Sequence, residues 1–195
     1  MYSQAVLLTS LVGLAAAATT NTNLQTAFPA SSGTTNLAAA RTLAAGEVLD
    51  GGMKQWDRSQ DAATFKQSSG TSYVNGGGAR KADDKVLQHN GAGTVAVKNF
   101  WAQDVGKVYR SCGNCGTQYA RKSTFDNIHV SGASVVAGVN GNLGDTTTIK
   151  NSCLLDGTSK ICWLYKGVTS GEPSKTASAP DGKVCATSTI KTSGC

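Results

Sequence analysis

Short apolar runs separated by turn residues dominate the chain from Gly46 to its end. Triplets containing valine, isoleucine or threonine alternate with glycine and asparagine, and strong helix formers are sparse. This pattern is typical of many short β-strands rather than helices. We therefore expect one all-β domain over residues 46–195, whose last part, 167–195, is an irregular tail tied down by a disulfide.

A weak internal repeat places an asparagine after each of three β-rich triplets. These residues are Asn99, Asn127 and Asn151, and successive members are 28 and 24 residues apart. Stacked coils of a β-solenoid produce spacings of this size, and an asparagine at each inward turn can hydrogen-bond its counterpart one coil away. Asparagine-rich turns also occur in β-sandwiches, so the repeat alone leaves both architectures open.

The chain before Gly46 follows a different pattern. Residues 1–18 hold an apolar run and then four alanines, which predicts a secretory signal peptide. The competing interpretation, a membrane anchor, needs a longer apolar run. We interpret 19–45 as a lead-in and cap, and we expect a secreted, extracellular monomer with no membrane partner.

Six cysteines follow the predicted signal peptide, at positions 112, 115, 153, 162, 185 and 195. An even number in an exported chain indicates disulfides, and fifteen pairings of six cysteines are possible. The alternative is a metal site starting at Cys112 and Cys115. A structural zinc site needs a second ligand pair at matching spacing, which the sequence does not offer.

The formal net charge is +6, which favours an acidic partner. Nucleic acid, an anionic membrane and an acidic polysaccharide all qualify. The basic residues are scattered and only 6% of residues are aromatic, whereas nucleic-acid modules more often combine a basic stripe with stacking aromatic side chains. Together with the predicted export, this composition favours an acidic polysaccharide and no nucleic acid.

The densest group of candidate catalytic residues lies between Gly76 and Cys115. Asp84 and Lys85 are adjacent, and Lys107 and Arg110 follow Lys85 after 22 and 25 residues. One solenoid coil has about this length, so Lys85 and Lys107 would lie on neighbouring coils about 5 Å apart. Lysines that close lower each other's pKa, and a lysine near neutrality can act as a general base. Spacing alone favours the simpler interpretation of three solvated cations on a polar face.

Four segments resemble the small microbial pectate lyases of polysaccharide lyase family 3. They are DGGMKQWDR (50–58), NGGGARKADDKVLQHNGAGTV (75–95), GKVYRSCGNC (106–115) and LYKGVTSGEP (164–173). The resemblance covers residues 46–182. It implies a right-handed parallel β-helix, here shortened by about two coils, that binds Ca²⁺ and cleaves the polygalacturonate of plant cell walls by β-elimination.

The resemblance also implies roles for five residues. Lys85 matches the proposed base, and Lys107 and Arg110 match the cations that hold and polarise a substrate carboxylate. Asp61 matches a calcium ligand, and Asp84 matches an acidic residue beside the base, so we expect both at the metal site. A solvated turn aspartate is the alternative for Asp61.

The chain departs from the family pattern after Arg58. About two coils are absent there, and Gln60 stands where the family has a glutamate. Calcium affinity depends on ligand charge and number, so we expect reduced activity or a high calcium requirement. A non-catalytic pectate-binding or effector-like member of the family is the alternative function, and an extracellular module without sugar binding is a third.

Two further groups of residues have simpler interpretations. The aromatic residues Phe100, Trp101, Trp163 and Tyr165 could stack on sugars, but in a solenoid they are more typical of core or cover. His89 and His129 lack a catalytic partner pattern, and we interpret His89 as a satisfied turn residue.

Overall fold

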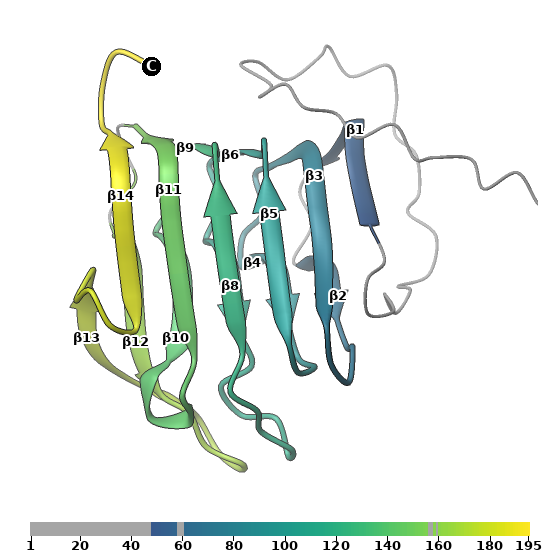
Figure 1. The fold of residues 1–195 in the computed structure, drawn as a ribbon, viewed down its shortest axis with the longest axis vertical. Coiled ribbons are helices and arrows are strands. Elements are labelled where there is room, and N and C mark those ends of the chain that lie inside the picture. The colour runs from purple at the N-terminus through teal and green to yellow at the C-terminus, as the bar shows by residue number, and fades with distance from the viewer. Residues whose placement is uncertain (1–47, 58–60, 156–157, 159) are drawn as a thin grey trace, which may run out of the picture.

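The chain forms a parallel β-solenoid in which two sheets face each other across a narrow core (Figure 1). The computed structural model describes residues 48–57, 61–155, 158 and 160–195. The parallel β-helix predicted from the sequence is thereby confirmed, whereas the predicted signal peptide (1–18) and lead-in (19–45) lie outside the described residues.

Each sheet is built from strands that succeed one another along the solenoid axis. The first sheet has eight strands: β1 (Val48–Asp57), β3 (Thr71–Arg80), β5 (Thr94–Lys98), β6 (Trp101–Gln103), β8 (Lys122–Asp126), β9 (His129–Ser131), β11 (Thr146–Leu154) and β14 (Cys185–Lys191). The second has six: β2 (Asp61–Phe65), β4 (Lys85–His89), β7 (Lys107–Ser111), β10 (Val135–Asn140), β12 (Cys162–Lys166) and β13 (Ser174–Ala179). A single 3-10 turn, η1 (Gly141–Leu143), follows β10.

Two ladders of apolar side chains fill the space between the sheets. In the first sheet Val74, Val97, Phe125 and Ile149 lie in register, and all are buried. In the second sheet Leu87, Tyr109, Ala137 and Cys162 do the same. The rings of Tyr109 and Phe125 meet edge to face with centroids 5.7 Å apart. The alternation of apolar residues along each strand therefore points one face of each sheet into the core.

Two of the three repeated asparagines, Asn99 and Asn127, form the contact that the sequence predicts, whereas Asn151 lies within β11 and is exposed. Asn99, Asn127 and Asn151 all have positive φ angles, between 50° and 56°, a conformation that asparagine tolerates better than most residues. The Asn127 amide donates to Asn99 Oδ1 at 2.7 Å, one coil away. Asn151 departs from this ladder, because its amide donates to Asp126 Oδ1 instead.

The C-terminal tail is more regular than the sequence indicates. The expectation of an irregular cover is wrong, because β13 pairs antiparallel with β12 and β14 pairs parallel with β11. Threonine and serine with isolated apolar residues fill these strands, so their pattern is weak. The disulfides Cys162–Cys185 and Cys153–Cys195 link this tail to the preceding coil. The third disulfide joins Cys112 and Cys115. The predicted disulfides are confirmed.

Among the described residues no helix has the length and apolar character needed to cross a membrane.

Close backbone contact between coils depends on Gly106, just before β7. Its amide donates to Ala82 O at 2.8 Å, and the Lys107 amide donates to Asp84 O at 2.6 Å. A Cβ atom at Gly106 would lie 2.5 Å from the carbonyl oxygens of Asp83 and Asp84. The missing side chain thus allows β7 to start directly beside the segment that carries Asp84.

His89 is a fully buried titratable group at the end of β4 and not in a turn. Its ring lies between those of Phe65 and Tyr109. Nε2 is 3.1 Å from the Ala92 carbonyl, which can only accept, so Nδ1 of the neutral ring accepts from the Tyr109 hydroxyl at 2.9 Å. Burial lowers the pKa of His89 from 6.5 to about 4.

We predict that folding stability falls as pH drops from about 6.5 toward 4. The unfolded chain takes up a proton on His89 first, because the folded-state pKa lies near 4, so the stability present above pH 6.5 is lost through this window. The protonation of His89 lowers the free energy of unfolding by about 3 kcal/mol over the whole window. Urea unfolding of wild type and His89→Gln at several pH values measures it. The variant should show a flatter pH dependence, and equal slopes would contradict the assignment.

We also predict that Gly106→Ala costs about 1–3 kcal/mol of unfolding free energy, because the new methyl group overlaps two backbone oxygens. Gly116→Ala is the matched control, since no atom lies within 4 Å of its Cβ position. That control should stay within about 0.5 kcal/mol of wild type. Urea unfolding at neutral pH measures both, and equal stability of the two variants would count against the close-contact argument.

Candidate active site

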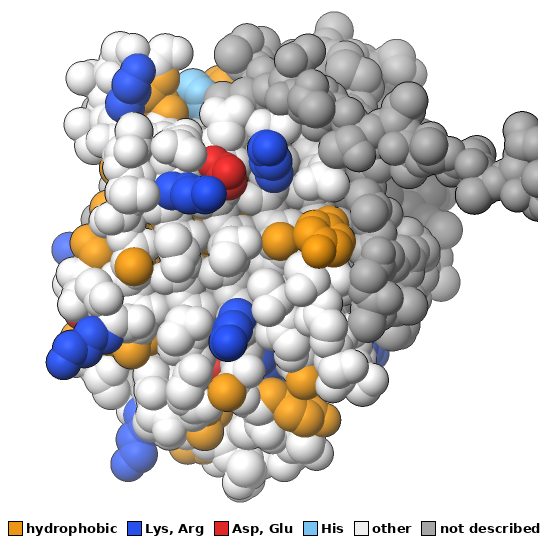
Figure 2. Space-filling model, in the orientation of Figure 1, with side chains coloured by type: hydrophobic (Ala, Val, Ile, Leu, Met, Phe, Trp, Pro, Cys, Tyr) orange, Lys and Arg blue, Asp and Glu red, His pale blue; other side chains and the backbone are white. Residues whose placement is uncertain are grey.

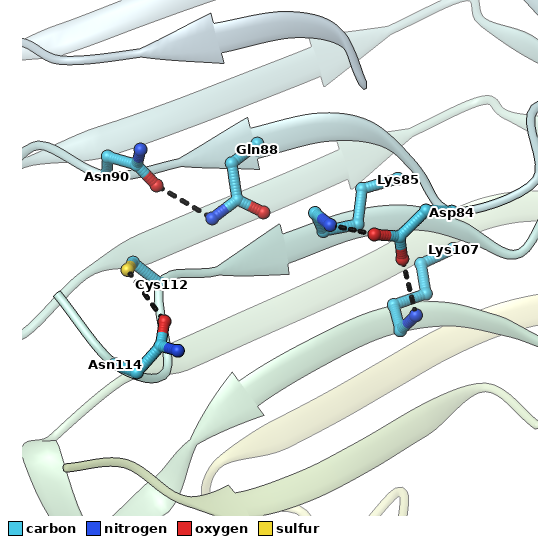
Figure 3. A network of polar contacts seen from close by, with 7 residues as sticks. All are labelled: Asp84, Lys85, Gln88, Asn90, Lys107, Cys112 and Asn114. Atoms are coloured by element: carbon cyan, nitrogen blue, oxygen red, sulfur yellow. Dashed lines mark hydrogen bonds and ion pairs between the residues drawn. The ribbon is translucent and has the colours of Figure 1, made fainter. Parts of the chain in front are cut away.

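Two of the predicted cations, Lys85 and Lys107, lie side by side at the start of adjacent strands. They are register partners in the β4–β7 pair, and Asp61 is the register partner of Lys85 in β2. The Asp84 carboxylate lies between the two amines: Oδ2 pairs with Lys85 Nζ, and Oδ1 is 2.9 Å from Lys107 Nζ (Figure 3). The 22-residue coil therefore brings both lysines to one carboxylate.

Asp84 supplies the charge that allows two ammonium groups to lie this close. Partial burial raises the pKa of Asp84, but the hydrogen bonds from Lys85 and Lys107 outweigh it and hold the pKa below its ordinary value. The spacing in the sequence predicts that each lysine faces mainly the charge of the other. The structure instead places an ionised carboxylate between them.

Arg110 lies three residues beyond Lys107 on β7 and is nearly buried. Its Nη1 donates to Ser111 O at 2.6 Å and to Asn140 Oδ1 at 3.0 Å, and its guanidinium stacks on the ring of Tyr165 at 3.8 Å. Nη2 is buried without a hydrogen-bond partner among the described residues. Burial lowers the pKa of Arg110.

Two glycines make room for this guanidinium. A Cβ atom at Gly138 would lie 2.8 Å from Arg110 Cδ, and one at Gly113 would lie 2.4 Å from Nη2. Gly113 belongs to the loop closed by the Cys112–Cys115 disulfide. The loop after β7 therefore covers the end of the Arg110 side chain.

A buried polar network anchors the same loop from beneath. Asp145 accepts from the Ser111 hydroxyl and from the backbone and side chain of Asn140. It also accepts from the backbone of Arg121, whose guanidinium in turn donates to the carbonyl oxygens of Gly91, Asn90 and Cys112. These contacts hold three coils together beneath Arg110.

A second orphaned polar atom lies next to Arg110. Gln88 is its register partner on β4, and Gln88 Oε1 is buried without a hydrogen-bond partner among the described residues. The Gln88 amide donates to Asn90 Oδ1 at 2.7 Å (Figure 3). Most buried polar groups in folded proteins have a hydrogen-bond partner, either in the protein or in ordered water.

A small cavity lies at the far ends of β2 and β4. It has a volume of about 280 Å³, and its lining includes Lys66, Asn90 and the exposed Tyr119. Lys66 follows β2 directly and is exposed. Sequence analysis assigned it no role. The strand register would have predicted the position of Lys66, because Phe65 pairs with His89 and the next residue, Lys66, then lies beside Asn90.

The aromatic residues are placed mostly as cover and core. Phe100 is buried, Trp101 stacks on His129 with ring centroids 3.8 Å apart, and Tyr165 lies under Arg110. Lys175 lies over the Trp163 ring at 4.7 Å.

The described side chains offer a poor fit for a calcium ion held by protein ligands alone. Among them, no three His, Cys, Asp or Glu side chains gather closely enough to hold a metal. Each oxygen of Asp84 already accepts from an ammonium group, and a divalent cation there would face two positive charges. For Asp61 only the backbone position is described.

The five predicted site residues are thus only partly brought together. Lys85, Lys107 and Asp84 form one contact group, and the backbone of Asp61 lies in register with it. Arg110 lies further along β7 and makes its contacts with β10 and β12 instead. The lysines and the arginine therefore form two separate cationic positions.

Comparison with known proteins places this arrangement in context. The chain is 45% identical over 122 residues to probable pectate lyase D of Aspergillus fumigatus, covering 62% of this chain and 50% of that protein. It is 47% identical over 122 residues to probable pectate lyase F of Aspergillus terreus, covering 61% and 51%. The chain thus spans about half the length of these curated relatives.

Solved structures agree with the fold. The catalytic domain of pectate lyase PelI from Erwinia chrysanthemi matches with a TM-score of 0.63 and 31% identity, covering 71% of this chain and 69% of that one. PelI in complex with tetragalacturonic acid matches with a TM-score of 0.68 and 30% identity, covering 78% and 55%. The family model described as pectate lyase matches residues 59–172, which is more than half of the chain, and the protein therefore belongs to the pectate lyase family.

Proposed function

We propose that this protein is a secreted polysaccharide lyase that cleaves the polygalacturonate of plant cell walls by β-elimination. Family membership supports the reaction class, and the relative solved with tetragalacturonic acid supports an oligogalacturonate as substrate. The observation that carries the proposal is the pair of lysines in register on adjacent strands, with Arg110 further along the same strand.

The first task of these cations is to bind substrate carboxylates. The Lys107 amine already has a carboxylate partner, Asp84, which it shares with Lys85. A substrate carboxylate can replace Asp84 as the partner of Lys107, and the exchange adds little desolvation cost at the amine. Arg110 lies beneath the loop after β7 and contributes positive charge from a buried position on the same strand. Positive charge at a galacturonate carboxylate stabilises the negative charge that develops when its C5 proton leaves.

Elimination then needs a base at C5 and an exit for the C4 oxygen. We assign the base to Lys85, whose unprotonated amine accepts the C5 proton. The electron pair of the C5–H bond forms the C4–C5 double bond, and the C4–O bond breaks. The departing oxygen takes up one proton from solvent and Lys85 returns one proton to the solvent, so the elimination consumes no water and one product carries an unsaturated end.

Asp84 acts in this scheme as a positioning residue. Its carboxylate holds both amines at one point before substrate arrives. The same carboxylate repels substrate anions, so binding depends on the one positive charge by which the two lysines exceed it.

We predict that Lys85→Ala lowers kcat on polygalacturonate by about 10²–10⁴-fold, because general-base catalysis contributes a factor of this size.

Lys107→Ala should chiefly raise KM, because it removes a carboxylate contact. The ultraviolet absorbance of the unsaturated product measures both, with Lys122→Ala as a surface control. Wild-type turnover by Lys85→Ala would exclude it as the base. Pectate binding by the wild-type chain without unsaturated product would indicate a non-catalytic member of the family.

We further predict weak calcium binding, with a Kd of about 10⁻⁴–10⁻³ M in the absence of substrate. The reason is that Asp84 is engaged by two ammonium groups and that no cluster of three ligands exists among the described residues. Isothermal titration with CaCl₂, using Asp61→Asn as a comparison, measures this affinity. Micromolar binding that Asp61→Asn abolishes would show that Asp61 belongs to a stronger site.

A further inference from the structure

A second groove crosses the outer face of the first sheet, on a different sheet from the candidate active site. It has a volume of about 390 Å³ and spans β3, β5, β8 and β11. Ala96, Thr124 and Thr148 lie in register along its floor. Small side chains at successive coils leave this floor flat.

A row of charges lines the same groove. Lys98, Asp126 and Lys150 are register partners on β5, β8 and β11. Figure 2 shows this face, with two lysine or arginine side chains on either side of an acidic one. The hydrogen bond from Asn151 lowers the pKa of Asp126 most, and Lys150 and Lys98 add to it. One carboxylate therefore faces two cations, which leaves the row with a net positive charge.

An exposed aromatic ring stands on β3, at one side of the groove. Tyr73 is 40% exposed and is one of two large hydrophobic residues left exposed among the described residues. Its register neighbour Ala96 does not cover it. The ring therefore offers an apolar face to a flat ligand, with a hydroxyl at its edge.

We propose that this groove is a second binding surface for polygalacturonate, remote from the point of cleavage. The inference rests on the proposed function for its choice of ligand. Lys98 and Lys150 lie two strand spacings apart, about 10 Å, so a chain of uronates laid across the strands meets two cations at this separation. The apolar face of a sugar ring packs on Tyr73. Polymer held here keeps the protein on its substrate between cleavage events.

The experiment measures retention of the full-length protein in gels that contain polygalacturonate. We expect the double variant Lys98→Ala/Lys150→Ala to bind about five- to tenfold more weakly, which is the effect of two solvent-exposed ion pairs. Tyr73→Thr should also weaken retention. The same loss is expected in a Lys107→Ala background, where the candidate active site is impaired. Lys122 lies on the same face but outside the groove lining, and Lys122→Ala should retain like wild type.

Several outcomes would overturn the inference. One is retention that Lys107→Ala alone abolishes and the groove variants leave unchanged. Another is an equal loss of retention for Lys122→Ala, which would indicate a general effect of positive charge. A third is equal retention in fully methyl-esterified pectin, which would indicate binding that does not involve carboxylates. Dimers in sedimentation that the groove variants dissociate would assign the groove to a second copy. Retention that depends on the groove, in a protein that yields no unsaturated product, would sustain the inference while refuting the proposed lyase activity.

Discussion

The pairing of parallel strands in register is the constraint on which the rest of the structure depends. Each coil repeats the strand positions of the coil before it, and each repeat advances the chain by one strand spacing of about 4.8 Å. Residues that share a register position are therefore neighbours however far apart they lie in the sequence. The asparagine contact between Asn99 and Asn127 and the lysine pair at 85 and 107 are two results of the same repeat.

The repeat also imposes a cost, because like residues at one position produce like charges a few ångströms apart. The protein relieves this repulsion in the same way at two places. Asp84 lies between Lys85 and Lys107, and Asp126 lies between Lys98 and Lys150. In both rows one carboxylate faces two amines. The repulsion between the amines is reduced, and each row keeps a net charge of one positive unit. An anionic polymer is the complement of such a surface.

The sequence predicted the repeat better than it predicted the chemistry built on it. The asparagine spacing and the coil length indicated which residues become neighbours, and this sufficed for Lys85 and Lys107. Charge partners within one turn are harder to foresee, since Asp84 precedes Lys85 directly and its orientation depends on the close contact at Gly106. The spacing left the place of Arg110 open, and an offset of three residues along β7 puts its backbone about 10 Å from that of Lys107. The strands β13 and β14 escaped prediction because threonine and serine give them little alternation. The orphaned Gln88 Oε1 leaves no mark in the sequence at all.

The two disulfides of the tail have a consequence for how the solenoid is terminated. A stack of coils ends in open strand edges, to which another chain could add. Here β13 runs antiparallel across the last coil, and Cys162–Cys185 and Cys153–Cys195 fasten the final segment on both sides. The two covalent bonds therefore hold the last strands against the coils before them, so these strands cannot separate one at a time. Reduction of these two disulfides would release the final segment from the coils before it, so the end of the stack is held in this way only while both bonds stay oxidised.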